Sequence, residues 1–349
     1  MKKILVTGGC GYIGSHTIVD LVQKGFEVIS IDNFSRSDKK MLEGVRKITG
    51  KEIVNYEIDL CDSAATKKIF EENKNITGII HFAAFKAVGE SVEQPLLYFR
   101  NNLISLINIL ECAVQFGVPN FIFSSSCSVY GNVKTLPVNE ETPLPEAASP
   151  YGRTKQIGEE IIFDTANACN IRFIMLRYFN PVGAHPSVEI GELPIGNPSN
   201  LFPSVFYTAL GKMKELIVHG NDYETSDGSC IRDFIHVMDI AEAHSLSLLY
   251  LMKNEISAEK RKFRNWNVEV MNLGTGKGYS VLEVINSFEK LSGEKLNYKI
   301  GDRRSGDVAA IFSDNKRAVE KLGWKNLKGL DEMILSAWRW TKKISEVKT

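Results

Sequence analysis

The sequence predicts an α/β protein with a doubly wound parallel sheet of the Rossmann type and a smaller α/β C-terminal lobe. Two observations carry this prediction. Over the first 180 residues, short apolar runs alternate with segments of helical periodicity, the pattern of β-α-β units whose strands are buried on both faces. In addition, glycines 8, 11 and 14 lie between the first expected strand and the first expected helix.

The expected elements of the first half follow one another regularly. Ile4, Leu5 and Val6 form the first strand, and Gly25 ends the helix that follows it. The later strands are expected at 27–32, 53–60, 78–84, 120–126 and 171–180, and the later helices at 63–73, about 95–116 and 150–169. Ligands bind at the carboxyl ends of such strands, so one rim is expected to carry Gly8, Asp32, Asp59, Ala83, Ser124, Ser125, Ser126 and Tyr178.

The pattern loosens after residue 180, where proline and glycine become frequent. We expect residues 1–180 to form the nucleotide-binding domain, with a segment near 233–255 returning to it, and residues 181–349 to form mainly the second, substrate-binding lobe. The G-x-G-x-G at 274–278 is interpreted as a turn, because no acidic strand end follows it. The charged segment 253–266 is expected to be a solvated, exposed loop.

The composition excludes several classes of partner. Lys plus Arg and Asp plus Glu are both 42, so the formal net charge is zero, and neither a nucleic acid nor a membrane is expected as a partner. The six cysteines are widely spaced, which favours reduced thiols in a cytoplasmic protein over disulfides or a metal site. The first residues are expected to form a strand rather than a signal peptide, and no run approaches the roughly 20 apolar residues of a membrane span.

The glycine spacing suits a dinucleotide. One glycine permits a tight turn, one lets the backbone approach a pyrophosphate, and one packs the helix against the strand, while the helix N-terminus offers N–H groups to the phosphates. The next strand ends in Asp32, whose carboxylate suits the hydroxyls of an adenosine ribose and would repel a 2′-phosphate. NAD is therefore expected, with NADP as an alternative because Arg36 is close in sequence, and Asp59 is expected near the adenine.

Tyr151 and Lys155 lie one turn apart on the helix that is expected to begin at Pro150. An ammonium group beside a phenol stabilises the phenolate and lowers the pKa of the tyrosine from about 10. The pair therefore predicts a proton-transfer site that faces the cofactor. His16 and His81 are interpreted as structural histidines rather than as catalytic bases.

Long stretches of the chain are similar to one family. These stretches are VTGGCGYIGSHT, HFAAFKAVGESV, NFIFSSSCSVYG, SPYGRTK, LRYFNPVGAHPS, GNDYETSDGSCIRDFIHVMDIA and RRSGD, and they run from residue 6 to residue 307. On these motifs the chain resembles the extended short-chain dehydrogenase/reductases and, within them, the UDP-glucose 4-epimerases. The resemblance implies reversible C4 epimerisation of UDP-galactose and UDP-glucose through a 4-keto intermediate with tightly bound NAD. It also implies a homodimer, built from the helices around 95–116 and 150–169.

The resemblance implies roles for particular residues. Tyr151 would exchange the O4 proton, Lys155 would lower the pKa of that tyrosine and bind the nicotinamide ribose, and Ser126 would hydrogen-bond O4. The implied cofactor-binding residues are Gly8, Gly11, Tyr12, Ile13, Gly14, Asp32, Asn33, Asp59, Leu60, Phe82, Ala83, Lys86, Asn101, Ser124, Tyr151, Lys155 and Tyr178. The implied UDP-sugar-binding residues are Lys86, Ser126, Tyr151, Phe179, Asn180, Asn200, Leu201, Arg232, Arg304, Asp307 and Ile311. No metal is expected, and Arg303 is interpreted as part of a surface ion pair.

One alternative substrate class stays open at this point, and two other functions are disfavoured. Ile311 stands where the family tends to have tyrosine in glucose-restricted members and a smaller residue in members that accept N-acetyl sugars. A 4-epimerase of UDP-N-acetylhexosamines, or of a UDP-pentose, is therefore an alternative. A 4,6-dehydratase is disfavoured, because it would need an acid and a base where this chain has Ser126 and Cys127. A catalytically silent NAD-sensing protein is disfavoured too, because it would be expected to lose Tyr151 or Lys155, and both are present.

Overall fold

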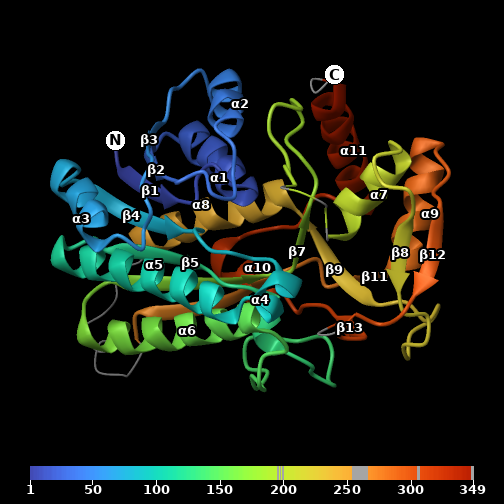
Figure 1. The fold of residues 1–349 in the computed structure, drawn as a ribbon. Coiled ribbons are helices and arrows are strands. Elements are labelled where there is room, and N and C mark those ends of the chain that lie inside the picture. Colours follow the sequence, from blue (N-terminus) through green and yellow to red (C-terminus); the bar gives the residue numbers. More distant parts are fainter. Residues whose placement is uncertain (195, 197, 199, 254–265, 305–306, 347–349) are drawn as a thin grey trace.

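The structure is a computed structural model of the 349-residue chain, and it describes all residues except 195, 197, 199, 254–265, 305–306 and 347–349. Figure 1 shows two parts: a large sheet covered by helices on both faces, and a smaller lobe on the right. Most of the charged segment 253–266, which was expected to be an exposed loop, lies outside the described residues.

The large sheet has seven strands, and every pair of neighbours in it is parallel. In spatial order the strands are β3 (Val54–Tyr56), β2 (Glu27–Ile31), β1 (Lys3–Thr7), β4 (Ile76–His81), β5 (Asn120–Ser124), β6 (Arg172–Tyr178) and β10 (Val268–Leu273). The direction of winding reverses between β1 and β4, where the connections diverge and a ligand can enter at the carboxyl ends of the strands. The Rossmann-type fold expected from the alternating pattern is confirmed.

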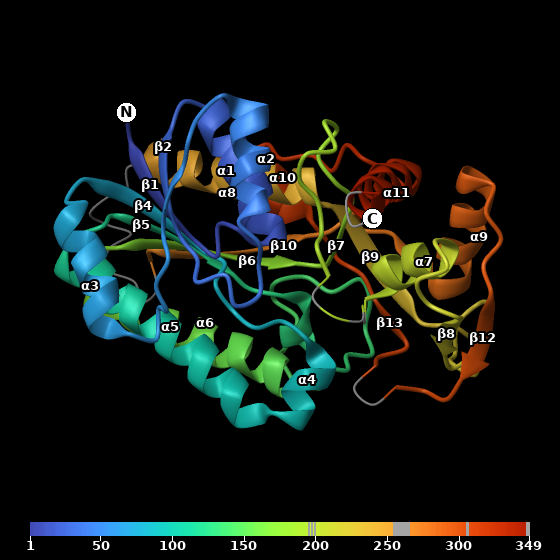
Figure 2. The ribbon, with the colours of Figure 1, turned by 45° about the horizontal axis from the view of Figure 1, so that its top comes forward.

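Helices cover both faces of this sheet (Figures 1 and 2). One face carries α1 (Tyr12–Gln23), α2 (Lys40–Thr49), α8 (Val237–Lys253) and α10 (Lys316–Leu322). The other face carries α3 (Ser63–Glu72), α5 (Pro95–Gln115) and α6 (Pro150–Ala168), and the short α4 (Val88–Glu93) packs against α5 and α6. No helix in the described part of the chain combines the length and the apolar character needed to cross a membrane.

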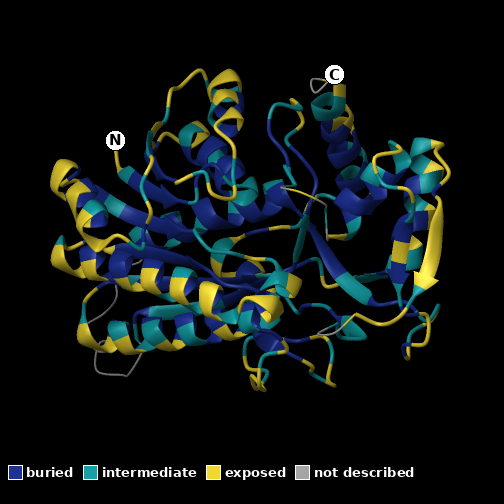
Figure 3. Ribbon diagram, in the orientation of Figure 1, coloured by how far each residue is buried: buried dark blue, intermediate teal, exposed yellow. Residues whose placement is uncertain are grey.

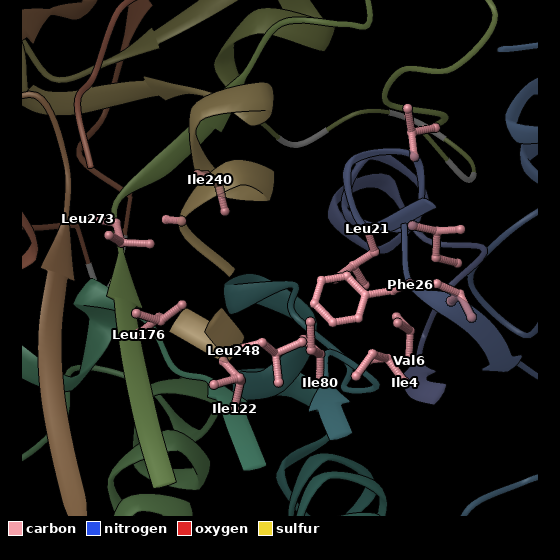
Figure 4. Close-up of a cluster of buried hydrophobic side chains, with 14 of the residues drawn as sticks. Ile4, Val6, Leu21, Phe26, Ile80, Ile122, Leu176, Ile240, Leu248 and Leu273 are labelled. Carbon is pink, nitrogen blue, oxygen red and sulfur yellow. The ribbon is translucent and has the colours of Figure 1, made fainter. Parts of the chain in front are cut away.

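In the strands of the large sheet other than the edge strand β3, alternate residues enter two separate hydrophobic clusters. Ile4 and Val6 belong to the cluster under α1 and α8, and Leu5 between them belongs to the cluster under α3, α5 and α6. Figure 4 shows the first cluster, where Ile80 of β4 lies near Leu248 of α8. These strands are therefore buried on both faces (Figure 3), which explains their continuous apolar runs, whereas β3 at the edge is partly exposed.

The smaller lobe is built around a second, mixed sheet. Its elements are β7 (Asn180–Val182), α7 (Leu201–Ala209), β8 (Leu216–His219), β9 (Ile231–His236), β11 (Gly278–Ser280), α9 (Val281–Ser292), β12 (Tyr298–Gly301), β13 (Ala310–Ile311) and α11 (Leu330–Glu346). β9 pairs with β7 and β13 in parallel and with β11 antiparallel, while β8 and β12 form a separate pair (Figure 2). Phe206, Phe288 and Trp338 pack together in its core, with ring centres 5.3–5.7 Å apart.

Two features differ from the sequence-based expectations. The strand expected at 53–60 ends at Tyr56, because the amide of Ile58 turns back to the Tyr56 carbonyl (3.1 Å) and leaves the ladder. The large sheet also takes β10 from the second half of the chain, beyond the returning segment expected near 233–255. The glycine turn at 274–278 is confirmed as a turn, and it wraps the buried Asp233 carboxylate, which accepts from the Thr275 amide at 2.8 Å.

Candidate active site

Gly8 and Gly14, at either end of the glycine loop that joins β1 to α1, leave no room for a side chain. A Cβ on Gly14 would lie 2.2 Å from the Gly8 carbonyl oxygen, and a Cβ on Gly8 would lie 2.9 Å from the amide nitrogen of Ala83. Gly8 also has a φ of 68°, which favours glycine. Gly11 precedes α1 and brings no side chain to cap the first N–H groups of the helix. The loop is therefore shaped for the close approach of a pyrophosphate to backbone N–H groups.

Asp32 lies at the carboxyl end of β2, next to this loop. Its buried carboxylate accepts from the Cys10 amide at 2.9 Å and from the Ser37 hydroxyl at 2.6 Å. Asn33 follows, and its side chain accepts from the Ser35 amide. These contacts fix the carboxylate beside the glycine loop, where a ribose of a dinucleotide would lie.

Arg36, the residue that kept NADP open, is engaged elsewhere. Its guanidinium pairs with Glu90 at 2.6 Å and lies 4.9 Å from the ring centre of Phe85. An arginine bound to a carboxylate is a poor partner for a 2′-phosphate, and Asp32 would repel that phosphate. The arrangement therefore fits NAD better than NADP.

The remaining expected cofactor residues are distributed along the same rim. Asp59 closes a turn by accepting from the Cys61 amide at 2.8 Å, and the carbonyl of the buried Leu60 accepts from Asn108. Phe82 leaves β4 with its amide bonded to the Thr7 carbonyl at 3.1 Å, which keeps this segment beside the glycine loop. Ile13 packs on α1 against the first cluster, and the Asn101 amide on α5 donates to Asn102.

The tyrosine and lysine on α6 face the end of β5. Tyr151 and Lys155 are both buried, and the Lys155 ammonium donates to the Ser124 carbonyl at 2.7 Å. The Ser124 hydroxyl donates to the Tyr178 phenol at 2.8 Å. Ser126 caps the 3-10 helix η1 (Cys127–Tyr130), because its hydroxyl accepts from the backbone amide two residues later. The structure thus brings the expected catalytic residues to the carboxyl edge of β5 and β6.

The electrostatics of Tyr151 differ from the expectation. Burial raises the pKa of Tyr151 above its ordinary value, the nearby Tyr178 raises it further, and a hydrogen bond with Ser126 lowers it. Burial also lowers the pKa of Lys155 to about 8, while Glu159 raises it. The expected lowering of the tyrosine pKa by Lys155 therefore finds no support in this arrangement, where the desolvation of the phenol outweighs other effects.

Three of the expected substrate-binding residues form an ionic cluster in the smaller lobe. Asp307 accepts from Arg232 at 3.3 Å and from Arg304 at 3.0 Å, and Arg232 also donates to the Val308 carbonyl at 2.7 Å. Two arginines around one carboxylate form a cationic group that is suited to a diphosphate and a ribose. Arg303 pairs with the exposed Asp222 at 2.7 Å, as expected of a surface ion pair.

Phe179 and Ile311 lie together on the apolar side of the site. Both are buried in a small cluster that also contains Tyr130, and Ile311 pairs along β13 with Arg232 of β9. Ile311 therefore connects the apolar cluster to the arginines. The Oδ1 atom of Asn180 is buried, with no hydrogen-bond partner among the described residues, so it is available to a ligand.

One acidic residue at the site escaped the sequence analysis. Glu192 accepts from Lys86 at 3.4 Å and from Asn200, the N-cap of α7, at 3.3 Å. Glu192 therefore links Lys86, in the large part of the molecule, to the start of α7. Leu201 is the first residue of that helix. Glu192 lies in a segment rich in proline and glycine, whose periodicity predicts no element, so no local signal marks it.

Comparisons with known proteins give consistent matches over nearly the whole chain. A family model described as GDP-mannose 4,6 dehydratase matches residues 5–336. The UDP-glucose 4-epimerase of Bacillus subtilis is 47% identical over 338 residues, which cover 97% of this chain and 96% of that protein. The crystal structure of UDP-glucose 4-epimerase from Bifidobacterium longum, in complex with NAD+ and UDP, has a TM-score of 0.92 at 44% identity and covers 98% of both chains. UDP-glucose-4-epimerase from Stenotrophomonas maltophila, with bound NAD and formylated UDP-arabinopyranose, has a TM-score of 0.92 at 41% identity and covers 99% of this chain and 100% of that one.

Proposed function

Because the chain belongs to the UDP-glucose 4-epimerases, within the extended short-chain dehydrogenase/reductases, we propose that it interconverts UDP-galactose and UDP-glucose by inverting C4 of the hexose. The observation that carries this proposal is the arrangement at the carboxyl ends of β1 and β5. There the glycine loop precedes α1, and Tyr151 and Lys155 of α6 lie beside Ser124 and Ser126.

The residues of the large sheet fit NAD. The loop from Gly8 to Gly14 and the N-terminus of α1 would hold the pyrophosphate, and Asp32 would bind the adenosine ribose. NAD, when bound, supplies the acceptor and then the donor of the hydride at C4 of the sugar. Because the cofactor ends each cycle in its starting state, it has no need to leave between turnovers.

Tyr151 moves the proton in this scheme. The step requires Tyr151 as the phenolate, a form that the positive charges of Lys155 and of bound oxidised nicotinamide would favour against the burial that raises the pKa of the phenol. The phenolate oxygen would take the proton from O4 of one sugar epimer, and the resulting phenol would return it to O4 after the keto sugar has turned over. Ser126, which hydrogen-bonds Tyr151, is also suited to donate to O4 and steady the proton transfer. Lys155 keeps a positive charge behind the phenol, and the Ser124 carbonyl holds it there. Since the proton returns to the atom that lost it, one tyrosine serves both directions.

Turnover of the keto sugar requires a grip on another part of the substrate. We assign this grip on the UDP part to Arg232, Arg304 and Asp307, which form one ionic cluster. Asn180 is assigned an amide contact with the substrate, and Phe179, which follows β6 directly, is assigned with Tyr178 to the floor near the sugar and the nicotinamide. A clamp on the nucleotide leaves the hexose ring free to present either face to the cofactor.

Dehydration, the activity named by the family model, does not fit this site. Elimination across C5 and C6 needs an acid and a base beside the tyrosine, and this chain has Ser126 and Cys127 in those positions. Burial raises the pKa of the Cys127 thiol to about 12, so it is a poor base near neutral pH. The epimerase relatives therefore describe the chemistry of this site better than the name of the family model does.

A panel of UDP-sugars tests the proposed function. Purified protein is expected to convert UDP-galactose to UDP-glucose, and a failure to interconvert them would contradict the proposal. Because Ile311 fills the apolar cluster with Phe179, we expect kcat/KM for UDP-N-acetylgalactosamine to be about tenfold lower than for UDP-galactose. Ile311→Ala is expected to raise N-acetyl turnover while UDP-galactose turnover changes little; an unchanged ratio would remove Ile311 as the determinant.

A homodimer and a cytoplasmic location complete the proposal. Leu97, Ile104, Ile107 and Val114 lie on α5 at spacings of one to two turns, and all four are exposed (Figure 3 shows the burial along α5). This apolar stripe supports a dimer in which α5 and α6 pack against a second copy. All six cysteines are free thiols, which supports a reducing compartment.

Ile104→Asp is expected to dissociate this dimer. A carboxylate in the middle of the stripe would be buried without a partner, so the dissociation constant should rise about thirtyfold or more. Sedimentation velocity across a dilution series measures the change, with Val319→Asp as the control, since it places the same new carboxylate at an exposed apolar position on α10. Dimers of unchanged affinity in the Ile104 variant would place the interface elsewhere.

A further inference from the structure

A buried acidic side chain lies on the same face of α6 as the tyrosine and the lysine. Glu159 follows Lys155 by one helical turn and Tyr151 by two turns, and it is 2% exposed. The proton-transfer steps described above give this carboxylate no role. Its burial therefore calls for an explanation from its contacts.

The Glu159 carboxylate accepts three hydrogen bonds, one from a serine hydroxyl and two from an arginine guanidinium. Its Oε1 accepts from the Ser125 hydroxyl at 2.6 Å and from Arg177 Nε at 2.9 Å. Its Oε2 accepts from Arg177 Nη2 at 2.6 Å. The pair is thus bidentate, and both side chains are almost fully excluded from solvent.

Ser125 connects this pair directly to the catalytic residues. It lies between Ser124, whose carbonyl accepts from Lys155, and Ser126, which hydrogen-bonds Tyr151. The Ser125 amide also donates to the Leu176 carbonyl at 2.9 Å. The hydrogen bond from Ser125 to Glu159 therefore fixes the backbone that positions Ser124 and Ser126.

Arg177 extends the network to the other side of Ser126. Its Nη1 donates to the Tyr130 phenol at 3.2 Å, and that phenol donates to Asn272 Oδ1 at 2.6 Å. Tyr130 is the last residue of η1, the short helix that Ser126 caps. The ends of β5, β6 and β10 and the end of η1 are thereby joined through one buried pair.

Glu159 also acts on the charge of Lys155. Burial lowers the pKa of Lys155 to about 8, and the Glu159 carboxylate opposes that change. The other titratable or charged groups near this lysine include Tyr151 on the same helix, His81 on β4, which burial keeps neutral, and Tyr178 on β6, whose phenol keeps its proton because burial raises its pKa to about 12. The positive charge of Arg177, which pairs with Glu159, offsets part of the effect of the carboxylate. Glu159 is thus a buried negative charge that favours the protonated lysine.

We propose that Glu159 is a positioning residue for the proton-transfer site: it fixes Ser125, and with it Ser124 and Ser126, and holds the positive charge of Lys155 behind Tyr151. A buried ion pair adds little stability over an apolar pair of the same size, so packing alone gives no reason for this one. The inference rests on the proposed function, and it gives Glu159 a role in that function without contact to the substrate.

Ser125→Ala tests the grip on the backbone. It removes one hydroxyl and leaves the ion pair intact, so kcat for UDP-galactose is expected to fall about tenfold while KM changes less than twofold. Ser105→Ala is the matched control, since Ser105 is equally buried but donates to the Asn102 carbonyl of its own helix. Equal losses of kcat in the two variants would overturn the positioning role.

The pH profile tests the effect on Lys155. Glu159→Gln leaves Arg177 buried without its partner, and that variant can fail to fold, so the double variant Glu159→Gln/Arg177→Met is measured beside it. In folded Glu159→Gln the alkaline limb of kcat is expected to shift toward lower pH by about one unit, because the lysine loses its proton more easily. In the double variant the shift is expected in the same direction but smaller, about a few tenths of a unit, because the loss of the Arg177 charge offsets part of it. A folded double variant with the wild-type pH profile would overturn the electrostatic part of the inference.

The two proposals fail in distinguishable ways. If the wild-type protein does not interconvert UDP-galactose and UDP-glucose, the proposed function fails. If the wild type is active and the variants at Ser125 and Glu159 keep its kcat and pH profile, the role of Glu159 alone fails.

Discussion

Tyr151→Phe is expected to lower the turnover of UDP-galactose by about 10²- to 10⁴-fold, the contribution typical of a general acid–base group. The substitution removes one oxygen from a buried ring, so the shape of the site and the KM should change little. The loss is assigned to the proton transfer because Ser126 and Lys155 keep their own contacts with η1 and with the Ser124 carbonyl. A coupled assay of UDP-glucose formation measures the effect.

Tyr298→Phe is the matched control for this prediction. Tyr298 lies exposed on β12 of the separate two-stranded sheet, so removal of its hydroxyl should leave turnover unchanged. Bound reduced cofactor, read from its absorbance after UDP-sugar is added, gives a second measurement. If Tyr151→Phe keeps turnover within about threefold of wild type, another group removes the O4 proton.

Acidification is expected to unfold the protein steeply, because four histidines are buried in the neutral state. Burial lowers the pKa to about 3 for His16, His81 and His236, and to about 4 for His244. The Nε2 atoms of His16 and His244 are buried, with no hydrogen-bond partner among the described residues. Protonation would add a charge and an unpaired donor at each of these atoms.

The sign and size of the effect follow from proton linkage. Below about pH 6.5 the unfolded chain binds protons at these histidines, whereas the folded chain does so only near pH 3 to 4, so the free energy of unfolding falls as pH falls. Each histidine contributes about 1.4 kcal/mol per pH unit in that window. Burial raises the pKa of Asp239 to about 6, which opposes the effect below that pH. The net slope should therefore be about 4 kcal/mol per pH unit between pH 6 and pH 4.

Urea denaturation at several pH values measures this slope. His244→Leu should flatten it by about 1.4 kcal/mol per pH unit, because one buried imidazole is removed. His219→Gln, at a partly exposed position on β8, is the control outside the buried set. An unfolding free energy that stays constant from pH 7.5 to pH 5 would contradict the prediction.

The fold could be predicted because its signals are local. The apolar runs of β1, β4, β5 and β6 are continuous, since each strand packs against helices on both faces, and the glycine loop lies between a strand and a helix. The extent of β3 could not be predicted in this way. The run at 53–60 is apolar enough for a longer strand, but β3 lies at the edge and pairs only through Ile29, Ser30 and Ile31.

The chemistry of the site was less accessible from the sequence. The spacing of Tyr151 and Lys155 predicts that they share a helix face, yet it carries no information on the desolvation that dominates the pKa of the phenol. Glu192 meets Lys86 only through tertiary contacts. Glu159 had a usable signal, because it repeats the four-residue spacing on α6, but its partner Arg177 lies on a different element.

The place of β10 in the large sheet sets a condition on how the chain can be synthesised and divided. β6 is complete at Tyr178, whereas the strand that covers its outer edge begins only at Val268. Until that strand emerges from the ribosome, the nascent protein presents an open, apolar β-edge that can pair with other chains. A fragment that stops near residue 180 would keep this edge permanently, and it would also lack the cover that α8 gives to one face of the sheet. The large sheet thus contains segments from both halves of the sequence, so truncation at a single position cannot yield either half as an independently folded domain.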